Sequence, residues 1–232
     1  MINRIIKLSN YLRANGLKKE ANYIDAIIKL ATPLGDISDV NEDMAKQMEE
    51  LEEIYFGPHG RAESAEEIMD DLQHQEDVTG VVYTGDKPED EGSVKGYLYG
   101  FRFDPWHHSI DWEDFECFVP ECEDIEYFIE DMEEQEEKRN ILYVSNLLVE
   151  KRYRHKVIEI IDGFLNKVRD SGYEYIVFDA MPRTFNLVMQ DGRPNPERES
   201  KFGLKVLGKT DYNAFLIRVD HPQGRFSKRP MK

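Results

Sequence analysis

Two histidines and two cysteines fall within one acidic segment of the chain: His107, His108, Cys117 and Cys122. Imidazole and thiolate groups are the ligands that zinc prefers in proteins. Their spacing fits no common zinc site, and adjacent histidines on a strand would point to opposite faces. We therefore expect no metal site, and interpret these residues as packing residues of an insertion. The sequence also shows no Ser/His/Asp or Cys/His catalytic pattern, no Walker loop and no dinucleotide fingerprint.

A second group of chemically capable residues follows the most apolar segment of the chain, residues 141–149. Arg152, Arg154, His155 and Lys156 stand together where an amphipathic segment begins. Such side chains can clamp an anion, and phosphate groups in particular. The alternative is a solvated basic start of a helix, although cations are normally disfavoured at a helix N-terminus. The residues alone leave both interpretations open.

The charge distribution excludes some classes of partner. The net charge is −17, with fourteen Asp/Glu and no Lys or Arg between residues 111 and 137, whereas residues 1–31 carry six Lys/Arg against two acids. A chain this acidic should repel nucleic acid, whose binding depends on cations that neutralise phosphates. With two cysteines and no apolar run of about 18 residues, we expect no membrane span and a cytoplasmic location.

The N-terminal region has the pattern of a short helical hairpin. Isoleucines and leucines recur at helical spacing in residues 2–30, and Asn15-Gly16 ends the first helix. Residues 31–36 contain Pro33 and Gly35 and are interpreted as a linker. We expect residues 1–31 to form a docking or packing module, residues 36–220 the main domain and residues 221–232 a basic tail. The hairpin could dock on a protein partner or complete the core.

The main domain shows alternating helix and strand signals. Asn41 is a good N-cap, and Ser64 with Glu67 forms a capping box. The acidic insertion, residues 104–140, contains six aromatic residues and should pack on the domain. Gly172 ends a long amphipathic helix between two apolar strands, which is the pattern of a parallel crossover unit. The predicted strands are 37–40, 78–83, 94–103, 141–149, 175–180, 204–208 and 213–219; the predicted helices are 42–56, 64–74, 123–138, 153–171 and 183–189, with a loop at 191–199.

Three stretches of sequence carry a resemblance to a known family. They are Leu147-Leu148-Val149-Glu150-Lys151-Arg152-Tyr153-Arg154, then Gly172-Tyr173, and then Lys201-Phe202-Gly203-Leu204-Lys205-Val206. With the order of the elements, they make the chain similar to the GNAT N-acetyltransferase superfamily. The resemblance implies an α/β (α+β) fold with a mixed, mainly antiparallel sheet and a parallel strand–helix–strand unit, to which the N-terminal helical hairpin is added.

The resemblance also implies a function and a set of residues. The family transfers an acetyl group from acetyl-coenzyme A (acetyl-CoA) to an amine. Backbone groups of Leu147 and Val149 would hold the pantetheine arm. Asn186 stands where the family often has an asparagine after the fifth strand. The implied pyrophosphate-binding residues are Arg152, Arg154, His155, Lys156 and Val157.

The sequence departs from the family pattern at three places. The family has Arg/Gln-x-x-Gly-x-Gly/Ala at the start of the long helix, whereas Val157 and Glu159 occupy both glycine positions here. Glycine lets a backbone approach a phosphate closely, so this change weakens the implied site. Glu199 stands at the position implied for a tyrosine that protonates the leaving thiolate. Tyr143 stands at the position implied for a carboxylate base, and Tyr212 is a further catalytic candidate.

Two functions therefore remain open from the sequence. The first is an acetyl-CoA-dependent N-acetyltransferase whose acceptor is an amine on a small molecule or a protein, since acidic residues concentrate cations. The second is a non-catalytic GNAT-like interaction or structural module that has lost cofactor binding. Fold alone does not decide between them.

Overall fold

The central feature of the fold is one eight-stranded sheet with the order β1-β2-β3-β5-β6-β10-β9-β4. The computed structural model describes residues 8, 11–21, 24, 34–60, 62–85, 90, 92–103, 110, 114–120, 141–179, 188–211 and 214–220. All neighbouring strands are antiparallel except β5 and β6. The strands are β1 (Leu34–Asp36), β2 (Thr79–Thr84), β3 (Val94–Arg102), β4 (Glu116–Cys117), β5 (Ile141–Val149), β6 (Tyr175–Asp179), β9 (Leu204–Lys209) and β10 (Ala214–Val219). This architecture confirms the predicted GNAT-like mixed sheet with its parallel pair.

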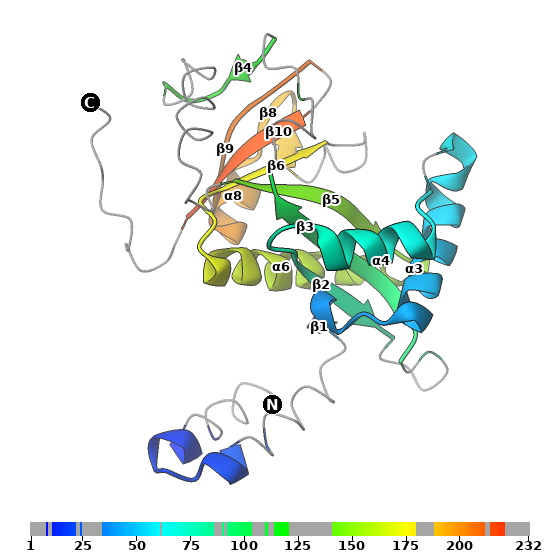
Figure 1. The fold of residues 1–232 in the computed structure, drawn as a ribbon. Helices are drawn as coiled ribbons and strands as arrows, with labels where there is room; N and C mark the ends of the chain where they lie inside the picture. Colours follow the sequence, from blue (N-terminus) through cyan, green and yellow to red (C-terminus); the bar gives the residue numbers. More distant parts are fainter. Residues whose placement is uncertain are drawn as a thin grey trace.

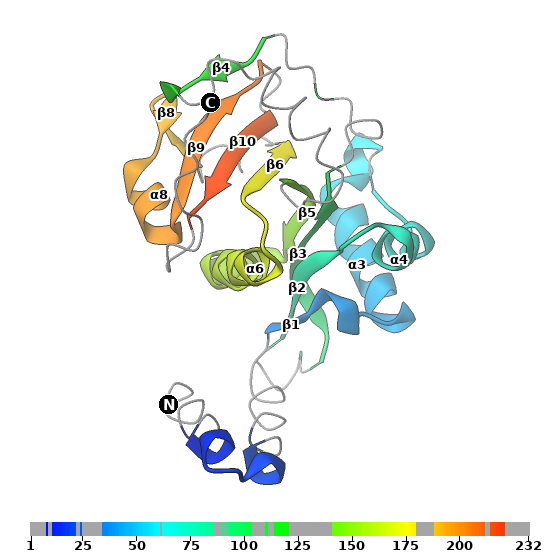
Figure 2. The ribbon, with the colours of Figure 1, turned by 60° about the vertical axis from the view of Figure 1, so that its left-hand side comes forward.

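Helix α6 (Val157–Ser171) links the two parallel strands and covers one face of the sheet (Figure 2). Its buried side chains are Ile160, Phe164, Leu165 and Val168, which recur at the helical spacing of an apolar stripe. Gly172 ends the helix in a left-handed conformation, with φ of 85°, as the sequence predicted. The stripe packs on Val81 and Leu98 of β2 and β3, among others.

Helices α3 (Glu42–Tyr55) and α4 (Ala65–His74) cover the opposite face of β2, β3 and β5 (Figure 1). Asn41 caps α3 by accepting a hydrogen bond from the Met44 N–H at 3.0 Å. The predicted capping box of α4 is present, since Ser64 and Glu67 bond to each other's backbone. Among the described helices, none is long and apolar enough to cross a bilayer.

Strand β5 changes its pairing partway along its length. It pairs with β6 over four residues, Ile141–Val144, and with β3 along most of its length to Val149. The register with β3 shifts between Tyr99 and Gly100, which leaves Ser145 as an extra residue on β5. Such a bulge bends a strand and re-aims it. Residues 145–149, here called the β5 edge, therefore run past the last β6 pair with one side unpaired among the described strands.

The remaining elements lie beyond β6. A short hairpin of β7 (Met189–Gln190) and β8 (Arg193–Pro194) precedes α8 (Pro196–Phe202), and β9 and β10 pair antiparallel after it. From the acidic insertion, Phe115 and Phe118 pack against apolar clusters of the sheet, and β4 pairs with β9. The predicted helix 123–138 lies outside the described residues.

Three predictions of local structure were wrong. The strand expected at residues 37–40 is a 3-10 helix, Ile37–Asp39, capped by the Asp36 side chain. The adjacent strand, β1, lies in the segment taken as a linker, because it pairs with β2 and Asp36 forms an ion pair with Lys167 of α6. The loop expected at 191–199 contains α8, which begins with Pro196 at a helix start where proline needs no N–H partner.

Of the helix predicted at 183–189, only the last two residues are described, and Met189 begins β7.

Gly100 allows the close approach of β3 and β5 at the bulge. A Cβ atom at this position would lie 2.2 Å from the Tyr143 carbonyl oxygen, which is backbone and cannot rotate away. Gly100→Ala should therefore lower the free energy of unfolding by about 2–3 kcal/mol, as overpacking does. Gly35→Ala is the matched control, since its Cβ would meet Val82 Cγ1 at 3.3 Å. Urea unfolding should show a clearly smaller loss for the control, and equal losses would contradict this account.

The N-terminal hairpin remains a prediction as a separable module. Its described residues include the expected stop at Asn15-Gly16, with Gly16 at φ of 81°. Leu8, Tyr11 and Leu17 are 47%, 64% and 45% exposed. Deleting residues 1–31 should leave the melting temperature within about 3 °C and change the oligomeric state or the capture of a protein partner. A fall of many degrees in the monomer would instead place the hairpin in the core.

Candidate functional site

The β5 edge combines an unpaired strand side with an adjacent helix start. Leu147 packs with Val149 in the apolar cluster beneath α6, so these two side chains are occupied by the core. Only their backbone N–H and C=O groups could contact a ligand, which is the role that the resemblance implies for them toward the pantetheine arm. The next residue after the edge is Glu150, whose N–H donates to the Lys95 carbonyl oxygen at 2.8 Å. The basic segment follows directly.

On the α3/α4 side, a group of carboxylates and phenols lies against the same edge. Glu63, which precedes the cap of α4, accepts hydrogen bonds from the Tyr99 hydroxyl at 3.2 Å and from Asn146 Nδ2 at 3.3 Å. Burial raises the pKa of the Glu63 carboxyl, and the charge of Asp71 raises it further, against the two hydrogen bonds. Glu63 and Asn146 are 83 residues apart in the sequence, so the fold alone brings them together.

Glu52 is the most deeply buried acid of this group. Its side chain is fully buried on α3 and accepts a hydrogen bond from the Tyr97 hydroxyl. Burial raises the pKa of the Glu52 carboxyl to about 7, with a further contribution from the charge of Glu63. Among the described residues, its Oε2 atom has no hydrogen-bond partner. A carboxyl in this setting is about half protonated at neutral pH.

The start of the basic segment is neutralised by two carboxylates. Arg152 Nη2 lies 3.0 Å from Asp90 Oδ1, and Arg152 Nε lies 2.5 Å from Glu150 Oε1. Lys95 Nζ contacts the same two acids at 3.5 and 3.2 Å. Asp90 also accepts the Tyr153 hydroxyl hydrogen bond at 2.6 Å, and this bond lowers the pKa of the Asp90 carboxyl. Two cations and two anions therefore form a closed network, here called the Asp90 network.

The backbone at this point also differs from the prediction. The helix expected at 153–171 begins as a 3-10 helix, Lys151–Lys156, and becomes α-helical only at Val157. The Tyr153 N–H donates to the Glu150 carbonyl oxygen, and the Val157 N–H donates to the Arg154 carbonyl oxygen. These donors are therefore not available to a phosphate. Arg154 and His155 are exposed, whereas Lys156 forms an ion pair with Glu159 at 3.1 Å.

Two of the predicted catalytic residues, Tyr143 and Glu199, lie in different surroundings. Tyr143 joins the carboxylate–phenol group: its hydroxyl donates to Asp179 Oδ2 at 3.4 Å, and burial raises the pKa of this hydroxyl to about 12. Glu199 accepts the Val206 N–H at 2.9 Å and lies 3.2 Å from Lys205 Nζ, so it braces α8 against β9. Asn186 and Tyr212 lie outside the described residues.

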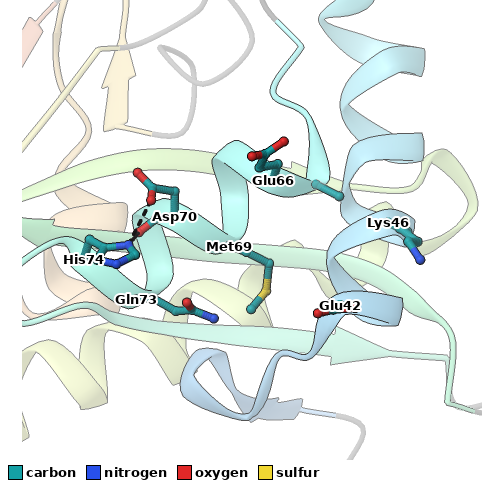
Figure 3. Close-up of a pocket in the computed structure, with 8 residues that line it drawn as sticks. Glu42, Lys46, Glu66, Met69, Asp70, Gln73 and His74 are labelled. Carbon is teal, nitrogen blue, oxygen red and sulfur yellow. Dashed lines mark hydrogen bonds and ion pairs between the residues drawn. The ribbon is translucent and has the colours of Figure 1, made fainter.

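An open groove runs between α3 and α4, and Figure 3 shows the residues that line it. His74 Nδ1 lies 2.9 Å from Asp70 Oδ1 at one end, and Met69 points toward the space between the helices. None of the predicted site residues lines this groove. In the part of the chain that the structure describes, no three His, Cys, Asp or Glu residues are placed to hold a metal ion. His107, His108 and Cys122 lie outside that part.

No protein-family model and no curated protein sequence matched the chain. Its fold is similar to solved N-acetyltransferases. The aminoglycoside 6'-N-acetyltransferase from Enterococcus faecium shares 12% identity over 80% of this chain and 94% of its own, with a TM-score of 0.42. An aminoglycoside 6'-N-acetyltransferase complexed with coenzyme A shares 13% identity over 80% and 94%, with a TM-score of 0.44. Tetrahymena GCN5 shares 10% over 82% and 96%, with a TM-score of 0.44. These likenesses concern the fold, and the chain has the mixed, mainly antiparallel sheet with one parallel pair that the resemblance predicts.

The Glu52 carboxyl should make stability depend on pH. Below pH 4.5 the group is protonated in both states; between pH 4.5 and about 7 the unfolded chain releases this proton while the folded chain keeps it. The free energy of unfolding should therefore fall with rising pH, by about 3 kcal/mol over this interval. Glu52→Gln should remove that fall, because an amide does not titrate in this range, while its oxygen can still accept the Tyr97 hydrogen bond.

Urea unfolding at pH 5 and pH 8 measures the effect. From pH 5 to pH 8, the free energy of unfolding of Glu52→Gln should rise by about 3 kcal/mol relative to that of the native chain. Glu50→Gln, an exposed residue of the same helix, is the control and should show the native profile. Parallel profiles for native and Glu52→Gln would contradict the assigned pKa.

Proposed function

We propose that this chain is an N-acyltransferase that moves an acetyl group from acetyl-CoA to an amine. The observation that carries the proposal is the β5 edge: strand β5 leaves β6 after Val144, beside the half-buried carboxylate of Glu63. An unpaired strand side offers N–H and C=O groups in fixed positions to an extended pantetheine arm. Such fixed N–H groups can also stabilise the charge that develops on a thioester oxygen during acyl transfer.

The residues fit acetyl-CoA better at its thioester end than at its phosphate end. Backbone groups of Leu147 and Val149 would hold the pantetheine arm, while Arg154, His155 and Lys156 would meet the phosphates. Arg152 is engaged by Asp90 and Glu150, so it would have to exchange partners to bind a phosphate. The acceptor would be a cationic amine on a small molecule or a protein, drawn by the acidic surface.

The Asp90 network supports a second candidate, a non-catalytic GNAT-like module. Its carboxylates neutralise the cations, and the 3-10 helix uses backbone N–H groups at the place where the resemblance implies a pyrophosphate. A chain in this state keeps the fold without binding the cofactor. The two candidates differ in whether acetyl-CoA binds at all, and calorimetry can measure this directly.

Isothermal titration with acetyl-CoA tests the proposal. The native chain should bind with a dissociation constant of about 0.1–1 mM, weak because of the Asp90 network. Asp90→Asn removes one competing charge, keeps an acceptor for Tyr153, and should tighten binding about fivefold, or ~1 kcal/mol. Asp70→Asn, an exposed acid of α4, should bind as the native chain does.

Other results of the titration distinguish the two candidate functions. Absence of binding to native, Asp90→Asn and Asp70→Asn alike would favour the non-catalytic module. Low-micromolar binding by the native chain would show that the Asp90 network does not compete with phosphates. Coenzyme A without the acetyl group should give the same order among the three chains, because the network lies at the phosphate end.

A further inference from the structure

Glu63 is placed unlike the other acids near the β5 edge. It comes from the connection between α3 and α4, yet its carboxylate lies between Tyr99 of β3 and Asn146 of β5. Asn146 belongs to the part of β5 that has passed the last β6 pair. A carboxylate here is next to the strand side that the proposed thioester would occupy. None of the residue patterns that carry the family resemblance includes it.

The two hydrogen bonds of Glu63 end on the same oxygen. Tyr99 and Asn146 both donate to Oε2, at 3.2 and 3.3 Å, which fixes the orientation of the carboxylate. Oε1 accepts neither of these bonds, and the side chain is half-buried rather than sealed in the core. An oriented carboxylate whose second oxygen takes no part in these two bonds can receive a proton from a bound group.

Other acids and phenols nearby are less suitable for this role. Glu52 is fully buried and bonded to Tyr97, so no acceptor can reach it. Tyr143 is bonded to Asp179, and its hydroxyl, with a pKa of about 12, is a poor base at neutral pH. Asp71, on α4, acts on Glu63 through its charge. The titratable groups that face Glu63 are thus Glu52, Glu67, Asp71, Tyr97, Tyr99 and Tyr143.

We propose that Glu63 is the general base that takes a proton from the ammonium group of a cationic amine acceptor, with Asn146 and Tyr99 as positioning residues. This inference rests on the proposed N-acyltransferase function. The carboxylate accepts one proton from R–NH₃⁺, which leaves a neutral amine. The nitrogen lone pair then forms the C–N bond as the C–S bond breaks. The second nitrogen proton goes to the departing thiolate, which leaves as a thiol.

The surroundings of Glu63 also define the acceptor class. The charge of Glu63 raises the pKa of Glu52, and the charge of Asp71 raises the pKa of Glu63; among the described residues, no Lys or Arg contributes to either shift. A cation entering this region is favoured, since it relieves repulsion among like charges. The acceptor is therefore an aliphatic amine that arrives protonated, rather than a neutral aromatic amine or an alcohol.

Acetylation of 1,4-diaminobutane by the full chain, followed by release of the coenzyme A thiol, tests the inference. Glu63→Gln should lower kcat at least about 100-fold, the usual scale for loss of a general base, while calorimetric binding of acetyl-CoA stays within twofold. Glu66→Gln is the matched control, an exposed glutamate at the start of α4, and should keep native kcat. Glu63→Asp should retain part of the activity.

The pH profile separates a base from a structural residue. Deprotonated Glu63 is the active form, so activity should rise with pH through its raised pKa. Asp71→Asn removes a charge that raises this pKa, and should move the rise in kcat to lower pH. Two results would overturn the inference even if acetyl-CoA binds. One is a rise of kcat at the same pH in Asp71→Asn as in the native chain, and the other is a native kcat in Glu63→Gln.

Failure of the proposed function would be recognised separately. If acetyl-CoA binds to none of the chains, calorimetric binding of 1,4-diaminobutane alone decides the role of Glu63. A loss of at least fivefold in Glu63→Gln, with native binding in Glu66→Gln, would support an ammonium site at Glu63. Equal binding in both variants, or no binding by the native chain, would overturn it. If Glu63→Gln does not fold, Asn146→Ala replaces it, with kcat and calorimetric binding measured in the same way. A native kcat and native binding in Asn146→Ala would overturn the positioning role.

Discussion

The change of partner along β5 is the constraint on which the rest of this structure depends. From Leu142 to Val144 the strand pairs with both β3 and β6, and after the bulge at Ser145 it continues with β3 alone. The close approach at Gly100 fixes where this change occurs. Backbone groups on the freed side can then bond to water or a ligand, because buried backbone groups need partners. Helices α3, α4 and α6 hold both faces of the strand in place.

The two ends of the β5 edge have opposite chemistry. Near Asn146 there are acids whose pKa values are raised by burial, in surroundings that favour a cation. At Glu150 the chain enters a basic segment, where Arg152 and Lys95 are balanced by Asp90 and Glu150. An anionic cofactor at one end and a cationic acceptor at the other would thus meet over the same strand.

The sequence predicted those features that depend on local rules. The caps of α3 and α4, the Gly172 stop and the apolar strands β5 and β6 follow from residue types within one turn or one strand. Strand β1 was missed because its three residues owe their conformation to pairing with β2. Helix α8 was missed because residues 191–199 were interpreted as a loop, although proline, here Pro196, is favoured at a helix start.

The candidate site was predicted less completely than the fold. Leu147, Val149 and the basic segment could be found because they are contiguous and resemble a family motif. The Asp90 network could not, since Asp90 and Arg152 are 62 residues apart and meet only through the sheet. Glu63 likewise had only one signal in the sequence, its place before the capping box, and that signal concerns helix α4. Its partners, Tyr99 and Asn146, come from two strands whose register sets the distance.

The Asp90 network and the Glu63 carboxylate would affect different properties of the proposed enzyme, namely cofactor affinity and catalysis. In the proposed function, the Asp90 carboxylate would compete with a phosphate for Lys95 and Arg152, which would lower affinity without altering how a bound thioester would lie on β5. The position of Glu63, in contrast, is set by hydrogen bonds to β3 and β5, so it does not depend on whether the cations are occupied. Weak cofactor binding is therefore compatible with effective chemistry once the cofactor is bound. Under the proposed function, Val157 and Glu159, which stand where the resemblance implies glycines, would bear on affinity, and catalysis would depend on Glu63 and the strand beside it.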